Sequence, residues 1–283
     1  MSSTSTPTES SCTTVSELPA EPSAKKTKLT TCQASQNQIY VFVVGNQKKV
    51  LQMPRCIARE SSDLIDAECK DLSDTAVHIK LYPNIPVEIF TLFLVWLSTG
   101  DLNNAEEFAS PPANPSALDL EDTSNKLNQL IQCYHLAEIL IARPFQNYIT
   151  DQICKYLESL VGKDGLLEKT IARNVPLVYA DVLKESKLKC LLEDAIVAST
   201  NNITRCTLID TPQTEPMFLA FWNGVAIAAI RRTKELEAGR MRFPLNWGEE
   251  DRCKYHEHKN DDEVEDCREK NGWVAQGRIG VDQ

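Results

Sequence analysis

Hydrophobic and polar residues alternate in short segments of the N-terminal half, and this pattern predicts β-strands. Residues 39–44 (IYVFVV) are β-branched and aromatic, and Gly45 with the following asparagine supplies a turn before a second strand. Residues 75–82 (TAVHIKLY) place apolar residues at alternate positions, which predicts a half-buried strand with Ile79 and Leu81 facing inward and the intervening polar residues facing solvent. These segments predict a small sheet built around a hairpin.

The most apolar stretch, IFTLFLVWLSTGDL, begins at residue 89. Its continuous run at residues 89–97 is less than half the roughly 20 residues that a membrane-spanning helix needs. A buried helix is the better interpretation, with Pro86 at its start and Gly100 just past its last turn.

The second half of the chain has the periodicity of amphipathic helices. One apolar stripe follows a helical repeat over residues 127–141, and further helices are expected from Pro144 and over residues 188–196. The segment 217–230 is apolar nearly all round, which predicts a helix that is buried or docks on a partner.

Composition and charge narrow the class of protein. The chain has 283 residues, 42% of them hydrophobic, and a net charge of −10, which argues against general binding to nucleic-acid phosphates. No signal peptide is visible, so a nuclear or cytoplasmic protein without membrane association is expected, with most of its ten cysteines as free thiols. Residues 25–28 (KKTK) fit either a short nuclear-import pattern or a solubilising charge cluster.

Four regions follow from these patterns. Residues 1–36 are rich in serine and threonine and are expected to be disordered, and residues 37–160 are expected to form a mixed α+β domain. Residues 161–235 form an α-helical extension in this interpretation, and residues 236–283 an acidic tail that contains cysteine and histidine.

The segments VFVVGNQKKVLQMP, RCIARESSDLIDA, HIKLYPNIPVEIF and LFLVWLSTGDL, in this order, resemble the BTB/POZ domain, in particular the fungal BTB proteins. The resemblance implies a small sheet with a helical cluster and a non-enzymatic role in dimerisation or partner recruitment. It places five residues in the structural core: Phe90, Phe93, Trp96, Thr99 and Gly100. Gln38 stands where many family members have an aspartate near their dimer pocket, so self-association stays open beside binding of another protein.

The face of the hairpin and the first helices is the partner-binding surface implied by the resemblance. The residues singled out there are Ile39, Val41, Leu64, Leu72 and Asp74. Leu72 and Asp74 lie where family members that bridge substrates to cullin ubiquitin ligases carry a short recognition element. An adaptor for a cullin-type ligase is therefore the alternative function.

The C-terminal segment CKYHEHKNDDEVEDC carries the only metal-ligand pattern in the sequence, C-x2-H-x-H-x8-C, formed by Cys253, His256, His258 and Cys267. Two thiolates and two imidazoles are a preferred ligand set of zinc, so a structural zinc ion is one interpretation. A solvated acidic tail that contains two histidines is the other. The resemblance to fungal BTB proteins includes a similar tail, and an enzyme using zinc there is a further alternative.

Catalytic signatures are otherwise lacking, because neither a P-loop, G-x-S-x-G nor H-E-x-x-H occurs. His135 lies at the edge of a helical stripe and is expected to be a histidine at the core boundary. We therefore expect no enzymatic activity and no bound cofactor apart from the zinc ion considered above.

Overall fold

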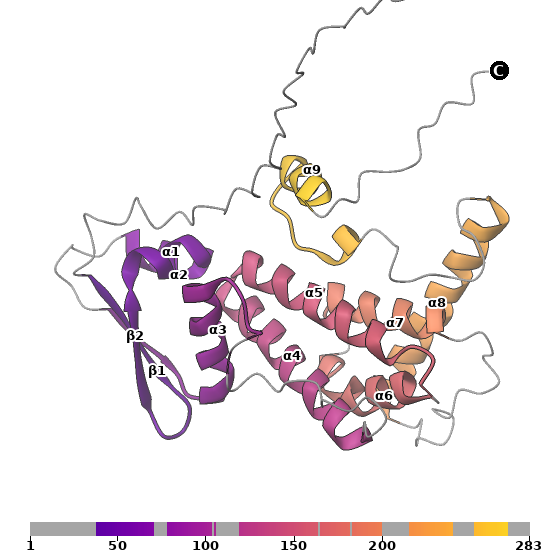
Figure 1. Cartoon of the computed structure of the whole chain (residues 1–283), viewed down its shortest axis with the longest axis horizontal. Helices are drawn as coiled ribbons and strands as arrows, with labels where there is room; N and C mark the ends of the chain where they lie inside the picture. The colour runs from indigo at the N-terminus through magenta and orange to yellow at the C-terminus, as the bar shows by residue number, and fades with distance from the viewer. Residues whose placement is uncertain are drawn as a thin grey trace, which may run out of the picture. The chain divides into compact units, whose positions relative to one another are not determined.

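A computed structural model of the chain describes residues 38–70, 78–103, 105, 119–163, 165–181, 183–199, 215–239 and 252–270. The segment 1–36, expected to be disordered, lies outside these residues, as do Leu72 and Asp74. The elements are β1 (Ile39–Val44), β2 (Lys49–Pro54), α1 (Arg55–Ser61), α2 (Asp63–Lys70), β3 (His78–Tyr82), α3 (Val87–Thr99), α4 (Leu120–Leu140), α5 (Arg143–Leu160), α6 (Leu166–Val178), α7 (Lys187–Ser199), α8 (Pro216–Glu237), the 3-10 turn η6 (Arg252–Tyr255) and α9 (Asp261–Lys270). The predicted α+β class is confirmed (Figure 1).

The three strands form one sheet in the order β2-β1-β3, with β2 antiparallel and β3 parallel to β1. The hairpin predicted around Gly45 is therefore correct. Tyr40, Phe42 and Val44 alternate onto the inner face of β1, and all three are fully buried. The ring of Phe42 lies 4.8 Å from that of Phe90 on α3, so the aromatic residues of β1 attach the sheet to the helices.

Strand β3 has the opposite orientation to the predicted one. Ile79 and Leu81 are 59% and 64% exposed, because they pair with Val41 and Val43 on the outer face of the sheet. Lys80 lies on the inner side, where its ammonium forms an ion pair with Glu68 of α2. Alternation alone does not say which set of residues faces the core; here the inward set contains Lys80, which pairs with Glu68, and the buried Tyr82.

Helix α3 is buried over its first half only. Phe90 and Phe93 have no exposed surface, and Phe93 lies 5.1 Å from the ring of Phe145 on α5. Trp96 is half-buried, and Thr99 and Gly100 are exposed, so the assignment of the last two residues to the core is wrong. The C-terminal turn of the helix extends past the residues that cover its first half, which is why these residues reach solvent.

Gly100 does end α3 as predicted. It adopts a left-handed conformation with φ of 74°, and its N–H donates to the Trp96 carbonyl at 2.7 Å. Pro86 precedes the first helical residue, also as predicted.

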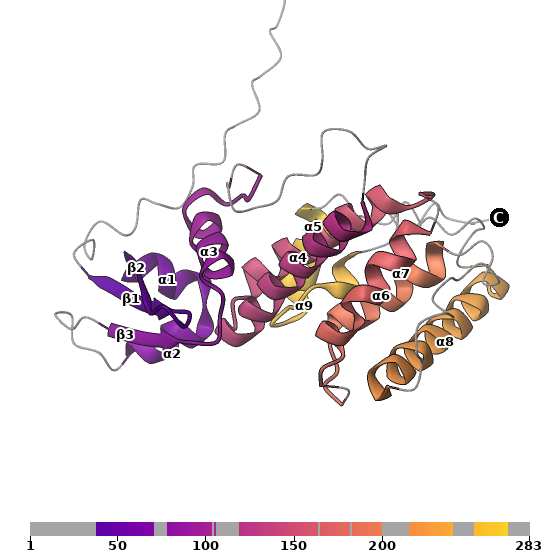
Figure 2. The same ribbon diagram turned by 90° about the horizontal axis from the view of Figure 1, so that it is seen from below.

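Helices α4 and α5 form an antiparallel pair that carries most of the remaining core, and α6 and α7 pack beside them (Figure 2). Helix α6 lies within the predicted α-helical extension, but it was not predicted as an individual helix. Its buried face contains Thr170 and Asn174, whose side chains bond to α4 through Thr123 and the Ser124 carbonyl. These polar residues, with Pro176 in the last turns, break the apolar pattern by which helices are recognised.

Helix α8 packs against α7 through one face, which includes fully or nearly buried Phe221 and Ala228. Its other face exposes more than half of Leu219, Ile227 and Ile230. The outward face is thus apolar as predicted but is not buried, and docking of this helix on a partner stays a prediction. Among the described residues, no helix combines the length and hydropathy that a membrane crossing requires.

Candidate metal centre

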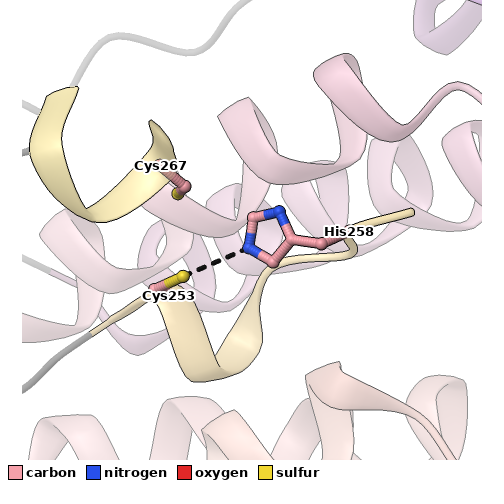
Figure 3. Close-up of side chains that lie close together, drawn as sticks. All are labelled: Cys253, His258 and Cys267. Atoms are coloured by element: carbon pink, nitrogen blue, oxygen red, sulfur yellow. Dashed lines mark hydrogen bonds between the residues drawn. The ribbon is translucent and has the colours of Figure 1, made fainter. Parts of the chain in front are cut away.

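The four predicted metal ligands lie on η6, on the segment that follows it, and on α9. The 3-10 turn holds Cys253, the next residues carry His256 and His258, and α9 returns Cys267 toward them (Figure 3). Asn260 begins α9, because its side-chain oxygen accepts from the Glu263 N–H at 2.9 Å. This cap directs the helix back across the segment that bears the histidines.

Three of the four ligand atoms form a compact group. The Cys253 Sγ lies 3.2 Å from the His258 Nε2, and these two atoms and the Cys267 Sγ are all within 4.8 Å of one another. Figure 3 shows the Cys253 thiol facing the His258 ring, with Cys267 of α9 beside them. The spacing in the sequence is therefore matched by proximity in space.

His256 adjoins this group and extends it. Its Nδ1 lies 3.1 Å from the Cys267 Sγ, while its Nε2 lies 3.2 Å from the Asp151 Oδ1 on α5. A carboxylate accepts hydrogen bonds, so the contact with Asp151 fits a ring that donates from Nε2 and turns Nδ1 toward the sulfur. His256 is only 3% exposed, so its ring is held in this orientation by its surroundings.

Helix α5 binds the segment that carries the ligands. The side-chain amide of Asn147 donates to the Glu257 carbonyl at 3.0 Å and accepts from the Glu257 N–H at 2.8 Å. Both backbone groups of Glu257 are therefore bonded to one side chain. Arg252 forms an ion pair with Glu158, about three turns further along α5 than Asn147. Asp151 lies between these two attachment points.

Helix α7 provides a second anchor through Asp194, which is 1% exposed. Its carboxylate accepts from the Tyr255 hydroxyl at 2.7 Å and from Arg231 of α8 at 2.7 Å, and the Lys254 Nζ lies 3.2 Å away. Burial acts to raise the pKa of Asp194, but Lys254, Tyr255 and the neighbouring arginines outweigh it and hold the pKa below the ordinary value. The ionised carboxylate therefore joins α7, α8 and η6.

The solvated-tail interpretation is contradicted for the part that carries the ligands. Cys253, Tyr255 and His256 are each no more than 3% exposed, although most residues of α9 face solvent. Burial lowers the pKa of His258, which favours the neutral imidazole that metals bind. The site thus combines four suitable donor atoms with a fixed surrounding shell.

The residues expected at a partner surface are distributed over several environments. Ile39 is 40% exposed and Leu64 is half-buried, whereas Val41 is only 8% exposed, because it lies in the central strand between two neighbours. For Val41 the expectation of an exposed contact residue is therefore wrong. Leu72 and Asp74 lie outside the described residues, so the cullin-adaptor alternative stays a prediction.

His135 lies at the core boundary, half-buried, and burial lowers its pKa. It lines a cleft of about 420 Å³ together with Glu138 and Lys184, which form an ion pair with each other at 2.9 Å. None of the four candidate metal ligands is among the described residues that line this cleft.

Sequence patterns did not identify Asn147, Asp151 or Asp194 as parts of the site. Each acts on residues more than 60 positions away in the chain, and no local spacing signals such a contact. Comparison with known proteins adds no assignment: no family model, curated protein or solved structure matches the chain.

Proposed function

We propose that the chain is a protein-interaction module of the BTB/POZ type, which binds a partner protein through the outer face of its sheet. The order of hairpin, two short helices, third strand and helical cluster supports the BTB/POZ assignment, together with the apolar helix that ends at Gly100. The observation that carries the proposed binding is the apolar character of the sheet surface that faces solvent.

The apolar residues of this outer sheet face that reach solvent include Ile39 and Val43 of β1, Val50 of β2, and Ile79 and Leu81 of β3, and Val41 is covered among them. The register places Val43 directly between Val50 and Leu81, so the apolar side chains are contiguous across all three strands. Val50, Ile79 and Leu81 are each more than half exposed. Contiguous exposed apolar surface on a sheet is unfavourable in water and typically marks an interaction site.

The inverted alternation of β3 strengthens this proposal. An ordinary half-buried strand turns its apolar residues inward, but here the polar Lys80 faces α2 and is held there by Glu68. If the strand were turned over, Ile79 and Leu81 would be less exposed, but the ion pair between Lys80 and Glu68 would be broken. The sequence thus keeps Ile79 and Leu81 on the surface, where a partner can cover them.

A specific interface of standard size buries about 800 Å² on each side. We therefore expect the partner to cover the outer sheet face and residues around it. The partner is a protein, and a second copy of this chain is one of the two outcomes that the experiment separates. The full chain contains no catalytic signature, and the proposed role is non-enzymatic.

The double variant Ile79→Glu/Leu81→Glu tests the proposal, with Leu183→Glu as its matched control, because Leu183 is 92% exposed and lies far from the strands in sequence. Light scattering at rising protein concentration measures self-association, and affinity capture from the native cell measures other partners. We expect the double variant to lose whichever complex the wild type forms and the control to keep it. Wild-type protein that stays at 31.7 kDa and captures nothing, or a double variant that associates normally, would sink the proposal.

A further inference from the structure

We propose that Cys253, His256, His258 and Cys267 bind one zinc ion as a closed, structural site, in which Asp151 orients His256. This inference concerns the C-terminal segment and is independent of the proposed partner-binding function. It depends on the distances among four side chains and on the contacts that hold them.

Three of the four ligand atoms lie at separations close to those of a tetrahedral zinc site, and the His256 Nδ1 contacts one of the three. With zinc–sulfur bonds of about 2.3 Å and zinc–nitrogen bonds of about 2.0–2.1 Å, ligand atoms are separated by roughly 3.3–3.8 Å. The two sulfur–nitrogen distances here are 3.2 Å and 3.1 Å, and the Cys253, His258 and Cys267 atoms are within 4.8 Å of one another. Shifts of about 1 Å or less bring these three atoms to tetrahedral distances.

His256 supplies the fourth ligand atom through Nδ1, which already contacts the Cys267 sulfur. A histidine that binds zinc commonly donates its other ring N–H to a carboxylate, which fixes the ring and its tautomer. The contact of Nε2 with the Asp151 carboxylate at 3.2 Å is this arrangement. It is a second observation, separate from the clustering of ligand atoms, and it also points to a metal.

The choice of metal follows from the donor set. Two thiolates and two neutral imidazoles favour zinc over magnesium or calcium, which prefer oxygen ligands. On binding, each thiol releases its proton to solvent and the sulfur donates an electron pair to the ion, with no change in oxidation state. Because four side chains complete the coordination, no position is left for water or substrate, and the site is structural and not catalytic.

The ion would close the C-terminal segment on itself. Cys253 lies on η6 and Cys267 on α9, so one ion bound by both would join these two elements. The segment is then attached to α5 through Asn147 and to α7 through Asp194. Zinc is thus expected to keep α9 folded back and to protect it from proteolysis.

Metal analysis of the purified full chain, with no metal added after expression, is the first test. We expect one zinc per chain in the wild type and less than a tenth of that in Cys253→Ser/Cys267→Ser. The matched control is Cys190→Ser, an exposed free thiol on α7 outside the cluster, which should keep its zinc. Replacement of zinc by Co²⁺ should give the visible absorption of a tetrahedral site with thiolate ligands in the wild type and in the control only.

Two further measurements keep the test informative if the double variant fails to fold. Chelation of the wild-type protein should increase the rate of proteolysis within residues 252–270, and addition of Zn²⁺ alone should reverse it. Asp151→Asn should bind zinc about 10–100-fold more weakly in competition with a chelator while its circular dichroism stays unchanged. Wild-type protein without zinc that also fails to take up Co²⁺, or protein that contains iron in place of zinc, overturns the proposal.

Discussion

Replacing Asp194 by asparagine removes one negative charge from the point at which α7, α8 and η6 meet, with little change in volume. The carboxylate is 1% exposed and is surrounded by Arg231, Lys254 and the Tyr255 hydroxyl. The Arg232 Nε also lies 3.7 Å away, on a side chain that is 2% exposed. The substitution therefore removes a buried negative charge beside three cations, of which Arg232 is buried and Arg231 and Lys254 are partly exposed, and it costs more than the loss of an exposed pair.

The magnitude follows from that imbalance. Removing one partner of a buried ion pair typically destabilises a protein by about 3–5 kcal/mol, and for a chain of this size each kcal/mol lowers the melting temperature by about 2–4 °C. We therefore expect Asp194→Asn to lower the melting temperature by roughly 6–20 °C. Asp66→Asn is the control, because Asp66 pairs with Arg59 and Lys70 at the surface, where such pairs contribute about 1 kcal/mol or less.

Urea denaturation followed by circular dichroism measures both variants, and pH adds a second readout. The pKa of Asp194 is lowered in the folded state, so its contribution is present above the unfolded value near 3.9 and is lost as pH falls through the lower, folded value. The stability difference between wild type and Asp194→Asn should accordingly shrink at acidic pH. If Asp194→Asn is no less stable than Asp66→Asn at neutral pH, the buried charge cluster does not hold the three elements together.

Three further predictions concern the core, the turns and a buried lysine. Phe93→Ala should cost about 3–5 kcal/mol and Trp96→Ala about 2 kcal/mol in urea unfolding, because only Phe93 is completely buried; equal costs would contradict this ranking. Gly100→Ala should cost about 1–2 kcal/mol, because only its left-handed backbone opposes the change. Gly45→Ala should cost about 1 kcal/mol more, because its added carbon would also lie 2.9 Å from the Val87 side chain. Thermal melting checks the order of the two glycine variants, and a smaller loss for Gly45→Ala would show that the hairpin turn relaxes freely. Burial lowers the pKa of Lys126 to about 8 from 10.5, so the folded chain holds fewer protons than the unfolded chain between these values, and the contribution of Lys126 to stability rises with pH across that window. Lys126→Met should therefore be more stable than wild type at neutral pH, with an advantage in urea unfolding that narrows toward pH 10, and an advantage independent of pH would argue against the lowered pKa.

Several elements were predictable because their signals are local. The hairpin around Gly45 and the helix between Pro86 and Gly100 both form where the sequence places turn and capping residues. The donor residues of the candidate metal centre were also predictable, because residue type and spacing define a zinc pattern before any fold is known. In each case the information lies within about 15 residues of chain.

Other features depend on what a residue meets from elsewhere in the chain. Which face of β3 turns inward depends on Glu68, which pairs with Lys80 on the inner side. Helix α6 depends on α4, which supplies hydrogen-bond partners for Thr170 and Asn174. Periodicity describes two faces of an element but carries no information about which face is covered. A polar residue becomes a core residue only when a distant partner completes its hydrogen bonds.

The sequence by itself determined the α+β class, the ends of α3 and the four donor side chains of the C-terminal segment, because backbone preference and ligand chemistry belong to individual residues. Tertiary structure alone decided that Ile79 and Leu81 face solvent, and that Asp151 holds His256 in the orientation of a metal ligand. The physical reason is distance along the chain: these contacts join residues that only folding brings together, and their energy depends on burial that no local pattern encodes.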